Sequence, residues 1–453
     1  MGGTRLIDRV RGAQGRLRPS DVGPSAGVLD KKRVDEIKEE LHAEVIESLD
    51  FDQVGSSGRD ELHERLRVQL TERVEARNLP LNRMERERLV EEILDNILGL
   101  GPLEQLLRDP EVSDIMINGP FNIFVERKGK MVKTNVVFND NKHLQQIVDR
   151  IVAAVGRRVD ESNPMVDARM IDGSRFNAII PPLALDGAAV SIRRFGTVPI
   201  GPEDLISYGS CPRPMMEVLK GAVKTGLNTI ISGGTGSGKT TLLNCLSSFI
   251  PESDRIITIE DAAELQLQQQ HVVRLETRPS NLEGKGEVSP RDLVKNCLRM
   301  RPDRIILGEI RGGEAVDVLT AMNTGHDGSL ATVHSNSPRD CLSRFETMVA
   351  IGMPNMGPQA IRETIARALD LVVQQSRLND GSRRVLSITE ITGMEGAVIT
   401  SQEIFTFDQE GVDENGKIRG KFRATGVRPR FTTRLASHGI RLSPELFRWS
   451  MDV

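Results

Sequence analysis

The stretch that decides the fold class is Gly233-Gly234-Thr235-Gly236-Ser237-Gly238-Lys239-Thr240, followed by Thr241. An apolar run centred on Ile230 and Ile231 precedes it, and an apolar segment that Pro251 ends follows it. A glycine-rich turn between a buried strand and a helix is the context that a phosphate-binding loop requires. We therefore predict that residues 233–241 bind a nucleotide, with Lys239 contributing a positive charge and Thr240 a hydroxyl ligand for Mg²⁺.

The nucleotide is expected to be ATP, because the sequence contains no Asn-Lys-x-Asp run of the kind that reads guanine. A glycine-rich turn that binds nothing is the alternative. The complete loop in a strand-to-helix context argues against that alternative.

Two further apolar strands are expected to end in acidic residues. The first strand, residues 255–260, ends at Glu260, and Asp261 and Glu264 follow it. The second, residues 304–308, leads into Glu309. Ligands of parallel sheets bind at the carboxyl ends of the strands, so these acids should converge near Lys239. We predict Glu260 and Glu309 as catalytic residues and, with Thr240, as Mg²⁺ ligands. A solvated strand end is the alternative for each acid alone, and either Glu260 or Glu309 could be the general base.

Residues 324–336 are expected to form a glycine-rich turn that leads into another strand. His326 and His334, two of the seven histidines, lie on either side of that strand. A lone histidine is more often structural. Beside a phosphate loop, however, such a residue can hydrogen-bond the γ-phosphate, and we predict this role for His334, with His326 as the alternative. Metal binding by the pair is not expected, because no cysteine or third histidine lies nearby.

The chain is long enough for about three domains. The pattern of apolar, polar and turn residues divides its 453 residues into several parts. Three helices are expected at 32–98, and the third should start at Asn82, with Glu85 three residues later, and end at Gly99. A C-terminal hairpin and a terminal helix are expected after Ala397. The predicted parts are a disordered arm (1–31), a three-helix bundle (32–98), an α+β domain of five short β-rich runs and one helix (99–195), a Pro-rich linker (196–214) and a doubly wound α/β domain (215–453).

Composition excludes several classes of protein. Basic and acidic residues nearly balance, at 60 and 64 with a net charge of −4, and aromatic residues make up 3%, so a nucleic-acid-binding surface is not expected. The four cysteines are scattered without a CxxC pair, which favours a reducing cytoplasm over a disulfide framework or structural zinc. No apolar stretch approaches the roughly 18 residues of a membrane span.

With its four motifs in this order, residues 100–400 resemble the type II/type IV secretion ATPase superfamily. In that superfamily the motifs are called Walker A, Asp box, Walker B and His box. The resemblance implies an α/β fold, with a RecA-like P-loop ATPase domain preceded by an α+β, PAS-like domain and a small helical bundle. It also implies ATP and Mg²⁺ as cofactors. Residues 274–279, 283–287 and 298–304 are similar to the tight-adherence (Tad) pilus branch, the CpaF/TadA-type motors.

The resemblance also implies partners and further site residues. Members are homo-hexamers that work with inner-membrane pilus platform proteins, so we expect a cytoplasmic location at the inner membrane, reached through these partners. Arginines of the β-rich domain reach the phosphates in such proteins, and Arg175, Arg193 and Arg194 match their positions, with Arg278 as a further candidate. Arginine suits this role because its fork can neutralise phosphate oxygens. Alternatively, these are ordinary surface arginines.

The protein is therefore expected to be an ATP-hydrolysing motor that drives assembly of a Tad-type pilus. Whether it also retracts the pilus does not follow from the sequence. The motifs do not separate it from a type IV secretion ATPase that drives protein or DNA export. A hexameric helicase and a non-enzymatic nucleotide-fold protein are more distant alternatives. Low aromatic content argues against the first. Intact Lys239, Thr240, Glu260 and Glu309 argue against the second.

Overall fold

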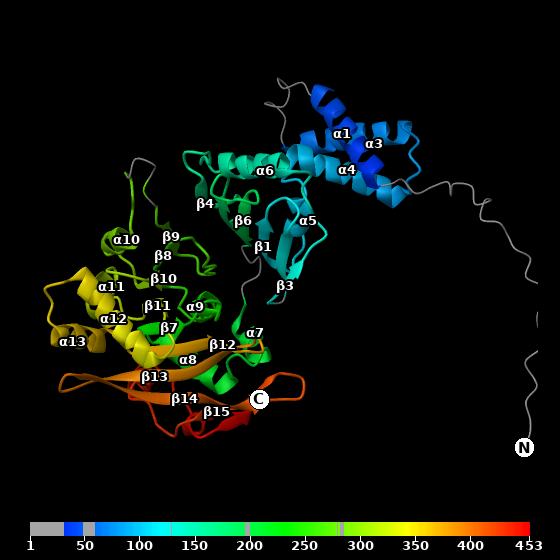
Figure 1. Ribbon diagram of the computed structural model, residues 1–453. Coiled ribbons are helices and arrows are strands. Elements are labelled where there is room, and N and C mark those ends of the chain that lie inside the picture. The colour runs from blue at the N-terminus through cyan, green and yellow to red at the C-terminus, as the bar shows by residue number, and fades with distance from the viewer. Residues whose placement is uncertain (1–30, 49–58, 128, 195–199, 279, 281–284) are drawn as a thin grey trace, which may run out of the picture. The chain divides into compact units, whose positions relative to one another are not determined.

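The computed structural model describes residues 31–48, 59–127, 129–194, 200–278, 280 and 285–453 (Figure 1). The chain forms two compact units. The first comprises Met1–Ala168 and Phe176–Ile192, and the second comprises Arg169–Arg175 and Arg193–Val453. The predicted disordered arm lies outside the described residues, apart from its last residue.

Among the described residues, the first unit begins with the helices α1 (Lys31–Ser48), α3 (Arg59–Ala76) and α4 (Arg83–Leu98). Their apolar faces share one core that includes Leu41, Leu70 and Ile93, each at most 1% exposed. The predicted start of α4 is confirmed. Asn82 Oδ1 accepts from Glu85 N at 2.9 Å, Asn82 N donates to Glu85 Oε2 at 2.8 Å, and the helix ends at Gly99.

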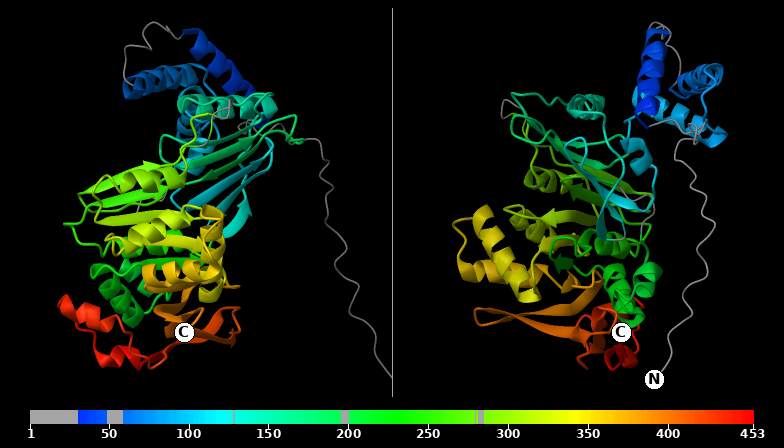
Figure 2. Two further views of the ribbon diagram at one scale, coloured as in Figure 1. Left: turned by 90° about the vertical axis from the view of Figure 1, so that its left-hand side faces the viewer. Right: turned by 45° about the vertical axis from the view of Figure 1, so that its right-hand side comes forward.

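A six-stranded sheet forms the rest of the first unit, in the order β3-β2-β1-β6-β5-β4. Figures 1 and 2 show helix α6 running across one side of this sheet. Strand β4 was not among the five predicted β-rich runs, because its alternating pattern is short and ends in a charged residue. The elements are α5 (Leu103–Leu107), β1 (Val112–Asn118), β2 (Ile123–Arg127), β3 (Lys130–Lys133), α6 (Asn141–Ala154), β4 (Met165–Arg169), β5 (Arg175–Ile179) and β6 (Ala189–Arg193).

The stretch predicted as a linker is largely helical where it is described. Residues Pro202–Ser207 form α7, and α8 (Arg213–Lys224) begins before the predicted linker ends. Pro202 stands at the first helical position, where proline's missing N–H costs nothing, and Gly201 N donates to Asp204 Oδ2 at 2.8 Å. These prolines were predicted to stiffen a linker, whereas Pro202 starts α7 and Pro212 and Pro214 lie at the start of α8. Residues 196–199 of the predicted linker lie outside the described residues.

The second unit is built on a ten-stranded sheet in the order β16-β15-β14-β13-β12-β7-β11-β10-β8-β9. The strands from β12 to β9 are parallel, as predicted for a doubly wound α/β domain. The elements of this part are β7 (Thr229–Gly233), α9 (Lys239–Ser247), β8 (Ile256–Glu260), β9 (Val272–Glu276), α10 (Pro290–Cys297), β10 (Arg304–Ile310), α11 (Ala315–Asn323), β11 (Leu330–His334), α12 (Pro338–Gly352), α13 (Pro358–Ala368) and β12 (Leu371–Arg377).

Helices cover both faces of the parallel strands, and each face has its own core. Neighbouring residues of β7 point to opposite faces: Ile231 packs with α8 and α9, and Ile230 packs with α10 to α13. Every residue of β7 is buried. This burial explains why the strand is a continuous apolar run in the sequence.

From β12 onward the strands turn antiparallel. The expected hairpin and terminal helix after Ala397 are therefore only part of this segment, which ends in a 3₁₀ turn and an edge strand. Within the described residues, no helix is both long and apolar enough to cross a membrane. The elements are β13 (Arg383–Glu395), β14 (Val398–Val412), β15 (Ile418–Ala424), α14 (Thr432–Ser437), the 3₁₀ helix Pro444–Phe447 and β16 (Ser450–Asp452).

Candidate functional site

The glycine-rich loop connects the carboxyl end of β7 to the first turn of α9, where Thr240 and Thr241 are half-buried. Gly236 (φ 69°) and Gly238 (φ 92°) have the left-handed backbone that favours glycine, and Gly238 caps α9. The Lys239 ammonium folds back and donates to Gly234 O at 2.9 Å. Burial lowers the pKa of Lys239, and the Glu309 carboxylate acts in the opposite direction. The loop thus presents a desolvated cation at a helix N-terminus, which suits a phosphate.

The strand register brings the other predicted site residues to the same edge of the sheet. Gly233, at the end of β7, pairs with His334 on β11 and with Gln375 on β12. On the far side of β11 lies β10, which carries Glu309, and then β8, which ends at Glu260. All these strands are parallel, so their carboxyl ends form one row beside the loop.

Glu260 is almost completely buried, with 4% of its surface exposed. Its Oε2 accepts the backbone N–H groups of Glu264 at 2.7 Å and Leu265 at 2.9 Å. Among the described residues, no group hydrogen-bonds to the buried Oε1. Burial raises the pKa of Glu260 against the opposing effect of the two backbone hydrogen bonds. A buried carboxyl with one orphaned oxygen is suited to bind a further polar group or to take up a proton.

Glu309 belongs to a charged network at the end of β10. Arg311 donates to Glu309 Oε2 at 2.8 Å through Nη2, and its Nη1 lies 2.8 Å from Asp261 Oδ2. The hydrogen bond to Glu309 raises the pKa of Arg311. Arg311 was not among the predicted site residues. Its position two residues after Glu309, just beyond the end of β10, could have suggested the pairing.

The predicted arginines all belong to the second unit. Arg175 Nη1 lies 3.4 Å from Glu264 Oε1, so it neighbours the segment that donates to Glu260. Arg193 ends β6 and is exposed, and Arg194 follows it half-buried. Arg278 instead donates to Gly286 O at 2.6 Å across its own β-bridge. Arg278 therefore has a local structural role in this conformation.

The two candidate histidines lie at opposite ends of β11. His334 is its last residue, beside Gly233, and burial and the nearby Lys239 charge lower the His334 pKa. His326 lies between the end of α11 and the start of β11. Its Nδ1 atom is 3.3 Å from the backbone oxygen of Ala321 in α11. Parallel strands start at the edge opposite the loop, so His326 is not brought to this site, and His334 is the histidine that is.

A second set of loop neighbours comes from β12 and β13, which were not predicted to lie beside the loop. Arg383 Nε donates to Gly236 O at 2.9 Å. A Cβ added to Gly233 would lie 2.3 Å from Gln375 O, so the loop passes directly against β12. Gln375 is 2% exposed, and among the described residues its buried Oε1 has no hydrogen-bond partner. These residues lie more than 130 positions after the loop in the sequence, and no local sequence pattern predicts that they contact it.

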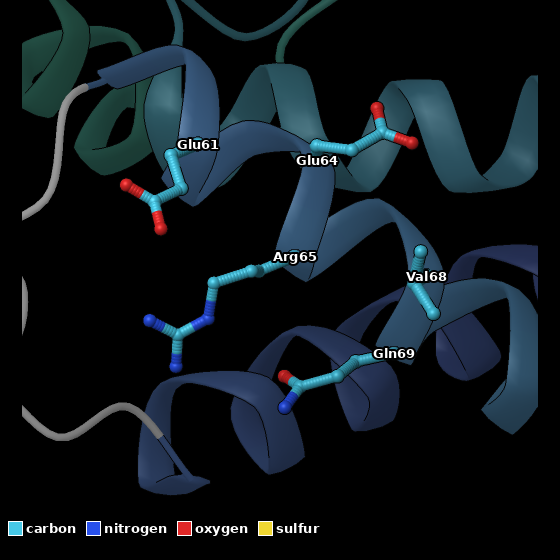
Figure 3. Close-up of a pocket in the computed structure, with 5 residues that line it drawn as sticks. All are labelled: Glu61, Glu64, Arg65, Val68 and Gln69. Carbon is cyan, nitrogen blue, oxygen red and sulfur yellow. The ribbon is translucent and has the colours of Figure 1, made fainter.

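A surface hollow elsewhere in the chain lies on a single helix. Figure 3 shows its lining side chains, Glu61, Glu64, Arg65, Val68 and Gln69, all of which come from α3. None of them is a predicted site residue. The row of strand ends in the second unit is therefore the candidate active site.

The chain is similar to several known proteins. The family described as type II/IV secretion system protein matches residues 96–420. The conjugal transfer protein TrbB of Rhizobium radiobacter is 34% identical over 68% of this chain and 91% of its own length. The type IV secretion system protein VirB11 of Brucella suis is 32% identical over 64% of this chain and 88% of its own. Among solved structures, the ATPase DotB of Legionella pneumophila matches with a TM-score of 0.46 and 23% identity, over 63% of this chain and 78% of its own.

Proposed function

Since the chain belongs to the type II/IV secretion system protein family, we propose that it is the ATPase motor of a pilus-assembly or secretion machine. One observation carries the proposal. The phosphate loop, His334, Glu309 and Glu260 stand in one row at the carboxyl ends of adjacent parallel strands. In this row Lys239 holds the phosphates, His334 detects the γ-phosphate, and a buried carboxylate activates water.

The donor set fits a magnesium ion. Mg²⁺ in nucleotide sites is held by one or two protein carboxylates, and phosphates, waters and other oxygens complete its octahedron. Thr240, Glu309 and Glu260 would supply those oxygens, and the orphaned Oε1 of Glu260 is free of protein donors among the described residues. Bound there with ATP, the ion would neutralise charge on the β- and γ-phosphate oxygens. Within the described residues, no cluster of three acidic, histidine or cysteine side chains offers an all-protein metal cage.

The arginines supply the remaining positive charge in this proposal. Arg175, Arg193 and Arg194 would approach the transferred phosphate, because a guanidinium fork can spread charge over two of its oxygens. The motor would act as a homo-hexamer at the cytoplasmic face of the inner membrane. Its contact with the membrane would run through platform partners.

For the machine that is driven, we propose assembly of a Tad-type pilus. The runs 274–279, 283–287 and 298–304, which are similar to Tad motors, support this choice. The relatives named for conjugal transfer and type IV secretion support an alternative, a motor for protein or DNA export.

A deletion strain separates these two functions. Loss of surface pili, restored by the wild-type chain and not by the Lys239→Ala variant, is the result expected for the pilus motor. Loss of substrate export with pili intact would replace it by the secretion motor. Complementation by Lys239→Ala would contradict both, because each function requires hydrolysis.

A further inference from the structure

The hairpin formed by β12 and β13 supports the phosphate loop from outside. Strand β12 is the parallel neighbour of β7, and Gln375 pairs with Gly233, the first residue of the loop. At the start of β13, Arg383 reaches the middle of the loop and donates from Nε to Gly236 O at 2.9 Å. We propose that Arg383 is a positioning residue for the phosphate-binding loop, an inference that rests on the proposed nucleotide site.

The hydrogen bond orients one peptide group of the loop. In a planar trans peptide, the C=O and the following N–H point in opposite directions. When Arg383 holds Gly236 O on the outside, the N–H of Ser237 is aimed to the inside of the loop. There it has only a long contact of 3.4 Å, to Gly234 O. An N–H group pointing inward is the donor that a phosphate oxygen needs.

The same side chain packs against the left-handed residue that starts α9. A Cβ built on Gly238 would lie 3.2 Å from Arg383 Cδ and 3.3 Å from Gln375 Nε2. Arg383 and Gln375 thus enclose the turn at which the loop becomes helix. This packing restricts the loop to the conformation in which its N–H groups converge.

The strand register also indicates that Arg383 needs an acceptor at this place. Arg377 and Arg383 are direct partners across the β12–β13 ladder, and like charges in that arrangement repel. The Arg377 Nη1 atom lies 3.8 Å from a Cβ built on Gly236, so both guanidinium groups lie next to the same loop residue. The partial negative charge of the Gly236 carbonyl offsets part of their repulsion.

The hairpin itself is anchored on its other face. Arg384 lies over the Phe407 ring at 4.8 Å and donates to Ile418 O at 3.3 Å. In the turn, Asp380 Oδ2 accepts from Ile418 N at 2.9 Å. Because successive strand residues point to opposite faces, the anchored Arg384 fixes the direction of Arg383. The hairpin that contacts the loop is therefore itself held by contacts with β14 and β15.

The test compares Arg383→Ala and Arg383→Lys in the full chain with Arg419→Ala, an exposed arginine of β15 that serves as the matched control. ADP affinity is measured by calorimetry, and KM and kcat by phosphate release, after melting curves verify the fold. Arg383→Ala should weaken ADP binding and raise the KM for ATP roughly three- to tenfold, the effect of one lost hydrogen bond, with kcat within about twofold. Arg383→Lys should recover part of the affinity, and Arg419→Ala should match the wild type.

Two outcomes would overturn the inference. Unchanged ADP affinity and KM in Arg383→Ala would show that the loop does not depend on this contact. A large loss of kcat at unchanged KM would assign Arg383 to the reacting phosphate rather than to positioning. The Lys239→Ala variant in the same assay tests the proposed nucleotide site separately from the role of Arg383. Full turnover by Lys239→Ala would contradict the nucleotide site itself.

Discussion

At the scale of single residues, Glu260 shows how burial prepares a carboxyl group for chemistry. Two backbone N–H groups bind one oxygen, while the other is buried without a donor among the described residues. Burial is the largest influence and raises the pKa of Glu260. The group is therefore held closer to the point at which it exchanges a proton than an exposed glutamate would be.

Replacing Glu260 by Gln should lower kcat by about 100-fold or more, because the amide cannot accept a proton. The raised pKa also makes the folded chain bind the Glu260 proton more tightly than the unfolded chain does. Stability from this proton is present at low pH and is lost as pH rises from the ordinary glutamate range through the raised value. Melting temperatures of both proteins across that range check this, since the wild type should lose stability relative to Glu260→Gln. A difference that stays constant with pH would contradict the burial argument.

The residues of the site differ in how far the sequence could predict them. Lys239, Glu260 and Glu309 follow from local patterns, since each ends or follows an apolar strand and parallel strands share a ligand edge. Arg383 and Gln375 could not be found in this way, because their approach to the loop depends on β12 lying beside β7 in the sheet. The distinction between His334 and His326 likewise required the position at which β11 begins.

At the scale of elements, the turn from β7 into α9 places the loop. Gly238 has φ of 92° and two side chains packed close to where a Cβ would be. The prolines of residues 202–214 show where sequence-based prediction fails. Composition predicted a linker, yet Pro202 begins α7, since proline at a first helical position favours a helix as readily as a stiff coil.

The Gly238→Ala substitution tests the importance of this turn. An alanine in the left-handed region costs roughly 1–2 kcal/mol, and its methyl group would press on Arg383 and Gln375. We expect a lower free energy of unfolding together with a higher KM for ATP, measured by denaturant titration and phosphate release. Gly411→Ala is the control, because Gly411 has no atom within 4 Å of a built Cβ and no left-handed φ. Equal effects of the two substitutions would refute the special role of the turn.

At the scale of the whole molecule, residues distant in the sequence share one compact unit. The segment Arg169–Arg175, between β4 and β5, and Arg193, at the end of β6, belong to the same unit as the phosphate loop. The three strands themselves belong mainly to the sheet of the first unit. The C-terminal residues Phe431 and Phe447 complete the core beneath the sheet, beyond the residues matched by the family. The sequence predicted the parallel half of this sheet and a hairpin after Ala397, which β14 and β15 form. It did not predict that β13 joins this hairpin to β12 in the same sheet, because no local pattern indicates these two pairings.

The double substitution Arg193→Ala, Arg194→Ala tests the proposed supply of charge to the phosphate. Turnover should fall by about 1,000-fold or more, the range found for transition-state arginines, while ADP affinity and the melting curve change little. Arg157→Ala, an exposed arginine of the first unit, is the control. Undiminished turnover in the double variant would remove both residues from the mechanism.

The most direct test of ATP hydrolysis at this site is phosphate release from ATP by the purified full chain, with and without Lys239→Ala. Lys239 should supply the charge that holds the phosphates, so we expect Mg²⁺-dependent turnover by the wild type and a loss of about 100-fold or more in the variant. The melting curves of the two proteins should coincide. Hydrolysis by Lys239→Ala at the wild-type rate would contradict the assignment of ATP hydrolysis to this row of strand ends.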